Sequence, residues 1–223
     1  MRRDVPGLSA FELMWADYLS AAVEATGLRH PFDGHYPVYA LVETLGSSEE
    51  QDRALLEAFL GDALEAGTVA DVVVAQSLED TKRLWGYRES IGELLGRLKP
   101  FAAFDVGIPM PAMEGFVGAV REALAQRFPA QRHLFFGHLG DGNLHLLSGP
   151  SADPASLHQV EEVVYAAVGR AGGSISAEHG IGVVKKEFLH HSRSAEEVEV
   201  MRGLKALLDP RGILNPGCIF DAA

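Results

Sequence analysis

Apolar residues recur along this chain with two periods, one typical of helices and one typical of strands. Helical spacing predicts helices over residues 9–26, 47–66, 77–95, 112–128 and 154–171. Short runs rich in apolar and β-branched residues predict strands over residues 38–45, 69–75, 101–106, 133–138, 143–147 and 174–177. Ser9 with Glu12, Ser47 with Glu50, and Ser77 with Asp80 have the spacing of helix caps at three of the helix starts. Two more helical stretches are predicted after residue 182, followed by an extended tail.

An Asp141-Gly142 step separates two predicted strands and indicates a tight hairpin, because both central positions of a type I′ turn need a positive φ. A hairpin requires an antiparallel pair, so the alternation of strands and helices predicts an α+β fold. We expect a ferredoxin-like antiparallel sheet with helices packed on one face, plus a helical C-terminal segment and an extended tail. No low-complexity linker divides the chain.

Composition narrows the class of protein. The chain has 223 residues, of which 47% are hydrophobic, so it is long enough to bury a core without disulfides or structural metals. Its 19 basic and 31 acidic side chains give a formal net charge of −12, which argues against nucleic acid and anionic membrane surfaces as partners. The single cysteine, Cys218, excludes an internal disulfide. Without a signal-peptide pattern or an apolar run of ~20 residues, we expect a cytoplasmic protein with no transmembrane segment.

The predicted hairpin places two histidines opposite each other. Counting outward from Asp141-Gly142, His138 faces His145, and directly opposed side chains share one face of a sheet. Glu178, in a second glycine-rich segment, offers a third ligand. Two imidazoles and a carboxylate suit Zn²⁺, and also Mn²⁺, Fe²⁺ or Co²⁺. His179, next to that carboxylate, would then be free to accept a proton.

Each of these residues also has a simpler interpretation. The two histidines fit a polar cross-strand pair, and Glu178-His179 fits a pair at the entry to a helix. Arg88, on an amphipathic helix, has the fork geometry to bind a substrate carboxylate. On spacing alone, a surface face of Arg and Glu accounts for Arg88 better.

Several motifs together resemble one known family. Gly137 to His145, Ser176 to Gly182 and Leu208 to Gly217 occur in the order found in the C-terminal half of FAD-linked 2-hydroxy-acid dehydrogenases and oxidases. That family includes D-lactate, glycolate and D-2-hydroxyglutarate dehydrogenases. Trp85 to Glu89 and Ser9 to Met14 also resemble family segments, so the resemblance covers essentially the whole chain.

The resemblance implies a role for each candidate residue. His138, His145 and Glu178 would bind a divalent metal, with Zn²⁺ the first choice. His179 would take the hydroxyl proton of a D-2-hydroxy acid as hydride passes to FAD, giving a 2-oxo acid. Arg88 would bind the substrate carboxylate, and Asn215 would approach the flavin.

The resemblance also implies that a partner is needed. Residues 1–208 resemble a substrate and cap domain, and residues 209–223 resemble a tail that contacts a flavin-binding domain absent from this chain. FAD would be bound mainly by that domain or subunit, and this chain alone would be inactive. The other expected partner is a small 2-hydroxy acid, and a homodimer is also compatible with the sequence.

Three positions depart from members that act on 2-hydroxyglutarate. Leu147, Ala103 and Gly92 stand where those members have an asparagine, a lysine and a threonine. A site without these groups would leave a second carboxylate unpaired, so a monocarboxylic substrate is expected. The tail also lacks a lysine after Gly217, which weakens that flavin contact.

Two other functions remain open from the sequence. The same His138, His145 and Glu178 set would serve a stand-alone metal-dependent hydrolase or oxygenase, and the fold would serve a non-catalytic binding module. The flavin-facing tail motif favours the dehydrogenase.

Overall fold

The computed structural model describes residue 5 and residues 7–221, and it has the predicted α+β class. Five strands follow one another across an antiparallel sheet in the order β2-β1-β4-β5-β3. The strands are β1 (Leu8–Trp15), β2 (Val38–Thr44), β3 (Ala102–Gly107), β4 (Arg132–His138) and β5 (Asn143–Gly149). The α-helices are α1 (Ala16–Thr26), α2 (Glu49–Glu65), α3 (Leu78–Arg88), α4 (Ile91–Leu98), α5 (Met113–Arg127), α6 (Pro154–Arg170) and α7 (Ala195–Leu208). Among the described residues there are also two 3₁₀ helices, η1 (Met110–Ala112) and η2 (Lys186–His191).

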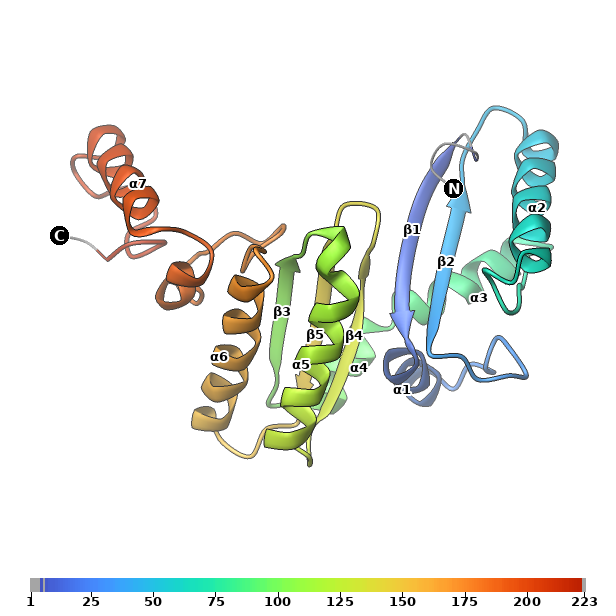
Figure 1. Ribbon diagram of the computed structural model, residues 1–223, viewed down its shortest axis with the longest axis horizontal. Helices are drawn as coiled ribbons and strands as arrows, with labels where there is room; N and C mark the ends of the chain where they lie inside the picture. The colour runs from blue at the N-terminus through green and yellow to red at the C-terminus, as the bar shows by residue number, and fades with distance from the viewer. Residues whose placement is uncertain (1–4, 6, 222–223) are drawn as a thin grey trace. The chain divides into compact units, whose positions relative to one another are not determined.

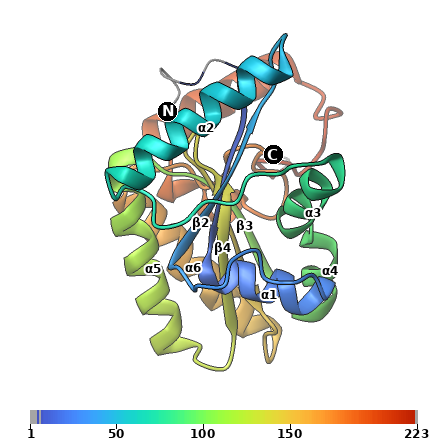
Figure 2. The ribbon, with the colours of Figure 1, turned by 90° about the vertical axis from the view of Figure 1, so that its right-hand side faces the viewer.

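The chain forms two compact units, which are described one at a time. The first comprises the residues up to Arg97 together with Leu134–Asp141. In it, β1 pairs with β2 along its whole length and with the end of β4, where Met14 lies opposite Phe136. Helix α1 packs against β4, since the ring centroids of Tyr18 and Phe136 are 4.4 Å apart. Helices α3 and α4 follow one another along one side of the strands (Figure 2).

The second unit comprises Leu98–His133 and the residues from Gly142 onward. Strands β3 and β5 pair antiparallel, and α5 and α6 lie side by side over one face of them (Figure 1). Phe104 of β3 meets Tyr165 of α6 with ring centroids 5.3 Å apart, and both are buried. A turn over residues 139–142 joins β4 to β5, so the predicted hairpin is present. Gly142 has a φ of 78°, and a Cβ there would lie only 2.7 Å from the Ile108 carbonyl oxygen. Asp141 has no positive φ, so the turn is not the predicted type I′ turn.

The first predicted helix is wrong over residues 9–15. This segment is β1, and α1 begins only at Ala16. Ser9 does not cap a helix but donates to the Glu43 carboxylate of β2, at 3.0 Å. Glu12 turns into the buried face, where a cation from α3 partners it. Pairing with β2 therefore overrides the helical spacing of the apolar residues.

Other element boundaries also change. Residues 69–75 form no strand, and their Asp71 accepts a hydrogen bond from Tyr36 at 3.1 Å. The helix predicted over 77–95 is divided into α3 and α4, while Ser77 caps α3 as predicted. Ser48, not Ser47, caps α2. The strand predicted at 174–177 is reduced to a single bridge between Gly107 and Ser174.

Two expectations concern the chain as a whole. Within the described residues, none of the helices has the length and apolar character needed to cross a membrane. The boundary predicted between residues 208 and 209 stays a prediction.

Candidate functional site

In the first unit, Glu12, Arg88 and His138 form a connected cluster. Glu12 lies directly opposite His138 in the pairing of β1 with β4. One Glu12 oxygen lies 2.6 Å from Nδ1 of His138, and the other accepts a hydrogen bond from Nε of Arg88, also at 2.6 Å. The side chains of Glu12 and Arg88 are each 7% exposed, whereas that of His138 is 36% exposed.

Arg88 therefore does not belong to a solvated surface face, which spacing alone had favoured. Its guanidinium lies 4.9 Å from the centroid of the Phe136 ring, and Nη2 lies 3.3 Å from Nε2 of His138. The backbone around it is fixed as well, because the buried Tyr18 hydroxyl donates to the Arg88 carbonyl at 2.8 Å. This environment holds a cation rigidly beside His138, which suits the recognition of an anion.

In the second unit, the loop after α6 carries Glu178 and His179. The His179 side chain is 67% exposed, and its ring stacks near that of His145 with centroids 6.5 Å apart. The loop is anchored by Asp105, which lies directly opposite His145 in the β3–β5 pair. Oδ2 of Asp105 accepts the backbone N–H groups of Ala177, Glu178 and His179 at 3.2, 3.0 and 2.9 Å.

A buried lysine faces the same carboxylate. Lys185 Nζ lies 3.7 Å from Oδ2 of Asp105 and donates to Ser176 Oγ at 3.1 Å. Burial alone would raise the pKa of Asp105, but the hydrogen bonds from His179 and Glu178 and the charge of Lys185 outweigh it and lower that pKa. Burial lowers the pKa of Lys185, and Asp105 opposes that shift. The pair is the electrostatic anchor of the loop.

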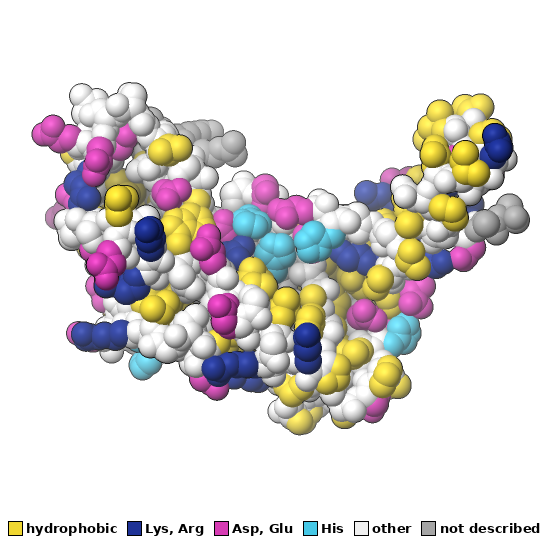
Figure 3. All heavy atoms as spheres, turned by 180° about the vertical axis from the view of Figure 1, so that it is seen from behind, with side chains coloured by type: hydrophobic (Ala, Val, Ile, Leu, Met, Phe, Trp, Pro, Cys, Tyr) yellow, Lys and Arg dark blue, Asp and Glu magenta, His cyan; other side chains and the backbone are white. Residues whose placement is uncertain are grey.

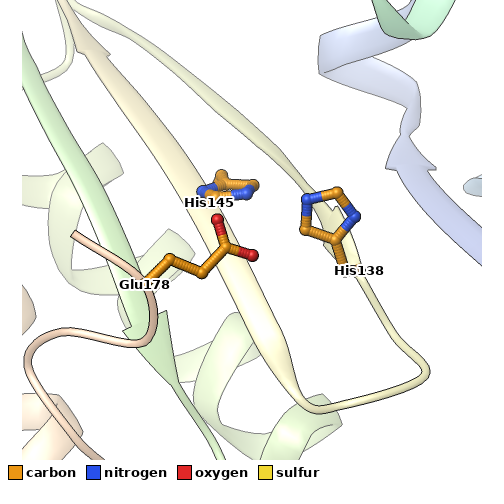
Figure 4. A group of neighbouring side chains, drawn as sticks. All are labelled: His138, His145 and Glu178. Atoms are coloured by element: carbon orange, nitrogen blue, oxygen red, sulfur yellow. The ribbon is translucent and has the colours of Figure 1, made fainter.

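Three of the predicted site residues lie together, as Figure 4 shows. His138, His145 and Glu178 each offer a ligand atom within 4.8 Å of the other two. Two imidazole nitrogens and a carboxylate oxygen suit a divalent metal, and the carboxylate contact on His138 resembles the outer partners that orient metal-binding histidines. These three side chains therefore fit a divalent metal ion. Asp105, Glu178 and His179 form a second group with the same spacing.

Two further aspects of the site differ from the prediction or stay untested. Asn215 lies in the tail beyond α7 with a φ of 47°, and its proposed approach to a flavin stays a prediction. Sequence reasoning missed Glu12, Asp105 and Lys185 as parts of the site. For Asp105 the available signal was a carboxylate inside a predicted strand that is otherwise apolar, since such a group is rarely buried without a partner.

A family model and several relatives in the comparison with known proteins point to the same protein family. A family model described as "FAD linked oxidases, C-terminal domain" matches residues 1–219. The chain is 40% identical over 220 residues to a D-2-hydroxyglutarate dehydrogenase of Xanthomonas citri pv. viticola, covering 96% of this chain and 46% of the relative. It is 34% identical over 226 residues to a protein of the same name from Stutzerimonas stutzeri, covering 99% of this chain and 48% of the relative. The mitochondrial D-2-hydroxyglutarate dehydrogenase of Bos taurus is 39% identical over 211 residues, covering 94% and 38%.

Among solved structures, 4-ethylphenol oxidase from Gulosibacter chungangensis in its isoeugenol complex matches with a TM-score of 0.53. The match covers 93% of this chain and 46% of that one at 15% identity, so it supports the fold alone. The chain spans about half the length of the bacterial relatives it matches.

Proposed function

Because this chain belongs to the family of C-terminal domains of FAD-linked oxidases, we propose that it is the substrate-binding half of an FAD-dependent D-2-hydroxy-acid dehydrogenase. The reaction is oxidation of the hydroxy acid to a 2-oxo acid. The observation that carries this proposal is the grouping of His138, His145 and Glu178 within a chain that matches the family over residues 1–219. FAD, when bound, would supply the hydride acceptor.

We assign the metal to His138, His145 and Glu178. Zn²⁺ is the first choice because imidazole and carboxylate are among its usual ligands, with Mn²⁺, Fe²⁺ and Co²⁺ as alternatives. Such an ion would supply Lewis acidity toward the substrate's hydroxyl and carboxylate oxygens. The arrangement supports this assignment because three ligands leave positions open for a substrate.

His179 is assigned as the acceptor of the hydroxyl proton. It adjoins the proposed ligand Glu178, and its ring is largely exposed, so a substrate is able to reach it. Nδ1 of His179 lies 3.7 Å from Oδ2 of Asp105, and the backbone N–H of His179 donates to the same oxygen at 2.9 Å. Asp105 therefore holds the backbone of His179 and lies beside its ring, which positions the imidazole to accept a proton.

Arg88 is assigned to the substrate carboxylate. Glu12 occupies its Nε, so the Nη groups carry the remaining donors. Burial of the ion pair keeps this cation from being fully solvated, which strengthens its attraction for an incoming anion.

The substrate is proposed to be a monocarboxylic 2-hydroxy acid. Ala103 lies opposite Leu147, and this pair is two residues along β3 and β5 from the pair of Asp105 and His145. Side chains two residues apart on a strand share one face, so all four side chains lie on the same face. The face beside the proposed metal ligand His145 therefore carries two apolar side chains. Neither of them is able to pair a second carboxylate.

The flavin-binding half is the proposed partner, and the tail from residue 209 onward, with Asn215, is the segment proposed to contact it. A cytoplasmic location and a homodimer also stay predictions. Membership of a flavin-linked family makes a stand-alone hydrolase or a non-catalytic module less favoured than the dehydrogenase.

The test uses this chain joined to, or mixed with, a flavin-binding half. We expect D-lactate oxidation with a higher kcat/KM than D-2-hydroxyglutarate, and a strong preference for the diacid would contradict the substrate assignment. Measuring the metal content of the wild type and of His145→Ala tests the ligand assignment. His158→Ala is the matched control, because His158 belongs to neither group of candidate metal ligands. Equal metal content in wild type and His145→Ala would refute the ligand assignment.

A further inference from the structure

Glu12 is a buried carboxylate that contacts two of the proposed site residues at once. Its side chain is 7% exposed, and each of its two oxygens contacts a polar group of the protein. Oε1 lies 2.6 Å from His138 Nδ1, and Oε2 lies 2.6 Å from Arg88 Nε. A carboxylate in this position is held by strand pairing, because Glu12 is the residue opposite His138.

These contacts select one form of the His138 ring. An ionised carboxylate only accepts hydrogen bonds, so the nitrogen facing Glu12, Nδ1, carries the proton. A guanidinium only donates, so the nitrogen 3.3 Å from Arg88 Nη2, which is Nε2, carries the lone pair. These two contacts therefore require the same tautomer of His138, with the proton on Nδ1.

We propose that Glu12 is a positioning residue that presents the Nε2 lone pair of His138 to the metal and that Arg88 occupies this lone pair until the metal binds. The proposal rests on the proposed role of His138 as a ligand. One lone pair is not able to accept an N–H and bind a metal at the same time. Metal binding therefore releases an N–H of Arg88 while Glu12 retains the guanidinium through Nε.

The released N–H gives the proposal a functional consequence. Arg88 is the residue proposed to bind the substrate carboxylate, so the metal makes one more of its donors available for that anion. By linkage, a carboxylate that binds Arg88 also favours metal binding by the same factor. Glu12 thus connects recognition of the metal and of the carboxylate through two hydrogen bonds of its own.

The first measurement needs no variant. Long-range ¹H–¹⁵N spectra of the metal-free chain at about pH 8, where a histidine of ordinary pKa is neutral, report which nitrogen of His138 carries the proton. We expect the proton on Nδ1. A proton on Nε2 would overturn the proposal, whether or not the chain binds metal.

The second measurement is zinc binding by Glu12→Gln. His138 and Arg88 contact different oxygens of Glu12, and glutamine has an NH₂ group, which only donates, in place of one of these oxygens. We expect zinc affinity to fall 10- to 100-fold, the usual effect of losing such an outer partner, and the His138 tautomer to become mixed. Glu43→Gln is the matched control because Glu43, on the neighbouring strand, accepts from Trp85 Nε1 at 3.0 Å instead.

The outcomes separate this proposal from the function on which it rests. Zinc affinity and tautomer in Glu12→Gln equal to those in Glu43→Gln would overturn the role of Glu12. A wild-type chain that binds no zinc would refute the metal assignment, and the tautomer measurement would still decide whether Glu12 orients His138. Acetate is the probe for linkage, and we expect it to tighten zinc binding in the wild type and less in Arg88→Met.

Discussion

Replacing Asp105 by asparagine should loosen the loop that carries Glu178 and His179. Asparagine has the same shape but no charge, so the three backbone N–H groups that Asp105 accepts would keep at most neutral hydrogen bonds. Lys185 would also lose the carboxylate that lies 3.7 Å from its Nζ. The side chains of Asp105 and Lys185 are 1% and 11% exposed, so water is a poor substitute for either partner.

The expected magnitude follows from these contacts. Hydrogen bonds to a charged group stabilise by about 1.5–3 kcal/mol and neutral ones by about 1 kcal/mol, so the change from charged to neutral acceptor weakens three of them by roughly 1.5–6 kcal/mol in total. Removing one member of a buried ion pair costs about 3–5 kcal/mol, which overlaps this estimate and is not added to it. We therefore expect the loop to be destabilised by about 3 kcal/mol.

Amide hydrogen exchange at Ala177, Glu178 and His179 measures this change directly. A loss of about 3 kcal/mol corresponds to exchange on the order of 100-fold faster at these amides. The matched control is Asp221→Asn, whose side chain is 82% exposed and which also pairs with a lysine, Lys186. That exposed pair is worth about 0–1 kcal/mol. Equal effects of the two substitutions would refute the reasoning.

A double variant tests the electrostatic interaction between Asp105 and Lys185. With asparagine at position 105, Lys185 is a buried cation without its partner, so Lys185→Met should be less harmful in the Asp105→Asn background than in the wild type. Strictly additive effects on the free energy of unfolding would show that the two side chains do not interact.

Three more predictions follow from other parts of the chain. The hydrogen bond from Lys205 is the first cause that lowers the pKa of Asp209, so the stabilisation it gives is present above the ordinary pKa and is lost as the pH falls through the lower folded value. A ¹³C titration of the Asp209 carboxyl should therefore have its midpoint below 3.8, and a midpoint at or above that value contradicts it. Gly142→Ala should destabilise the chain to urea by about 2 kcal/mol, because of its positive φ and the nearby carbonyl, whereas Gly140→Ala, which has open space, should change little. In the flavin-loaded enzyme, Leu147→Asn should raise the ratio of kcat/KM for D-2-hydroxyglutarate over D-lactate roughly tenfold, and an unchanged ratio would exclude Leu147 from substrate selection.

A further surface has no assigned occupant. Helix α7 exposes aliphatic side chains, and Figure 3 shows hydrophobic side chains gathered on this helix. The exposed members are Val200, Leu204, Leu207 and Leu208. Exposed apolar patches often mark contacts with other proteins, so this helix is where covering by the flavin-binding half should first be sought.

The hairpin and its two histidines could be predicted because the information is local. The Asp141-Gly142 step predicts the hairpin, and counting outward from it predicts that His138 faces His145. The structure brings a ligand atom of each histidine within 4.8 Å of the other. The segment from Ser9 to Trp15 could not be resolved in the same way, since its apolar residues fit both a helix and a strand. What decides it is pairing with β2 and a buried ion pair whose members are 76 positions apart in sequence.

The same limit explains the missed site residues. Glu12 meets His138 across 126 positions, and Asp105 meets the backbone of His179 across 74. No periodicity within a helix or strand contains such a contact, although a carboxylate within an apolar strand signals that some partner is needed. Sequence reasoning therefore located the groups proposed to touch metal and substrate, and missed those that hold them.

The two missed carboxylates share a position but differ in what they hold. Glu12 lies opposite His138 and Asp105 lies opposite His145, so each hairpin histidine has a buried acid on the neighbouring strand. Glu12 bonds to the imidazole itself, whereas Asp105 directs its oxygen to the backbone of the loop that bears Glu178 and His179. Loss of Glu12 should therefore change the His138 tautomer and leave exchange at the loop amides unchanged. Loss of Asp105 should have the opposite pattern, and a variant that changed both equally would show that the two anchors are not independent.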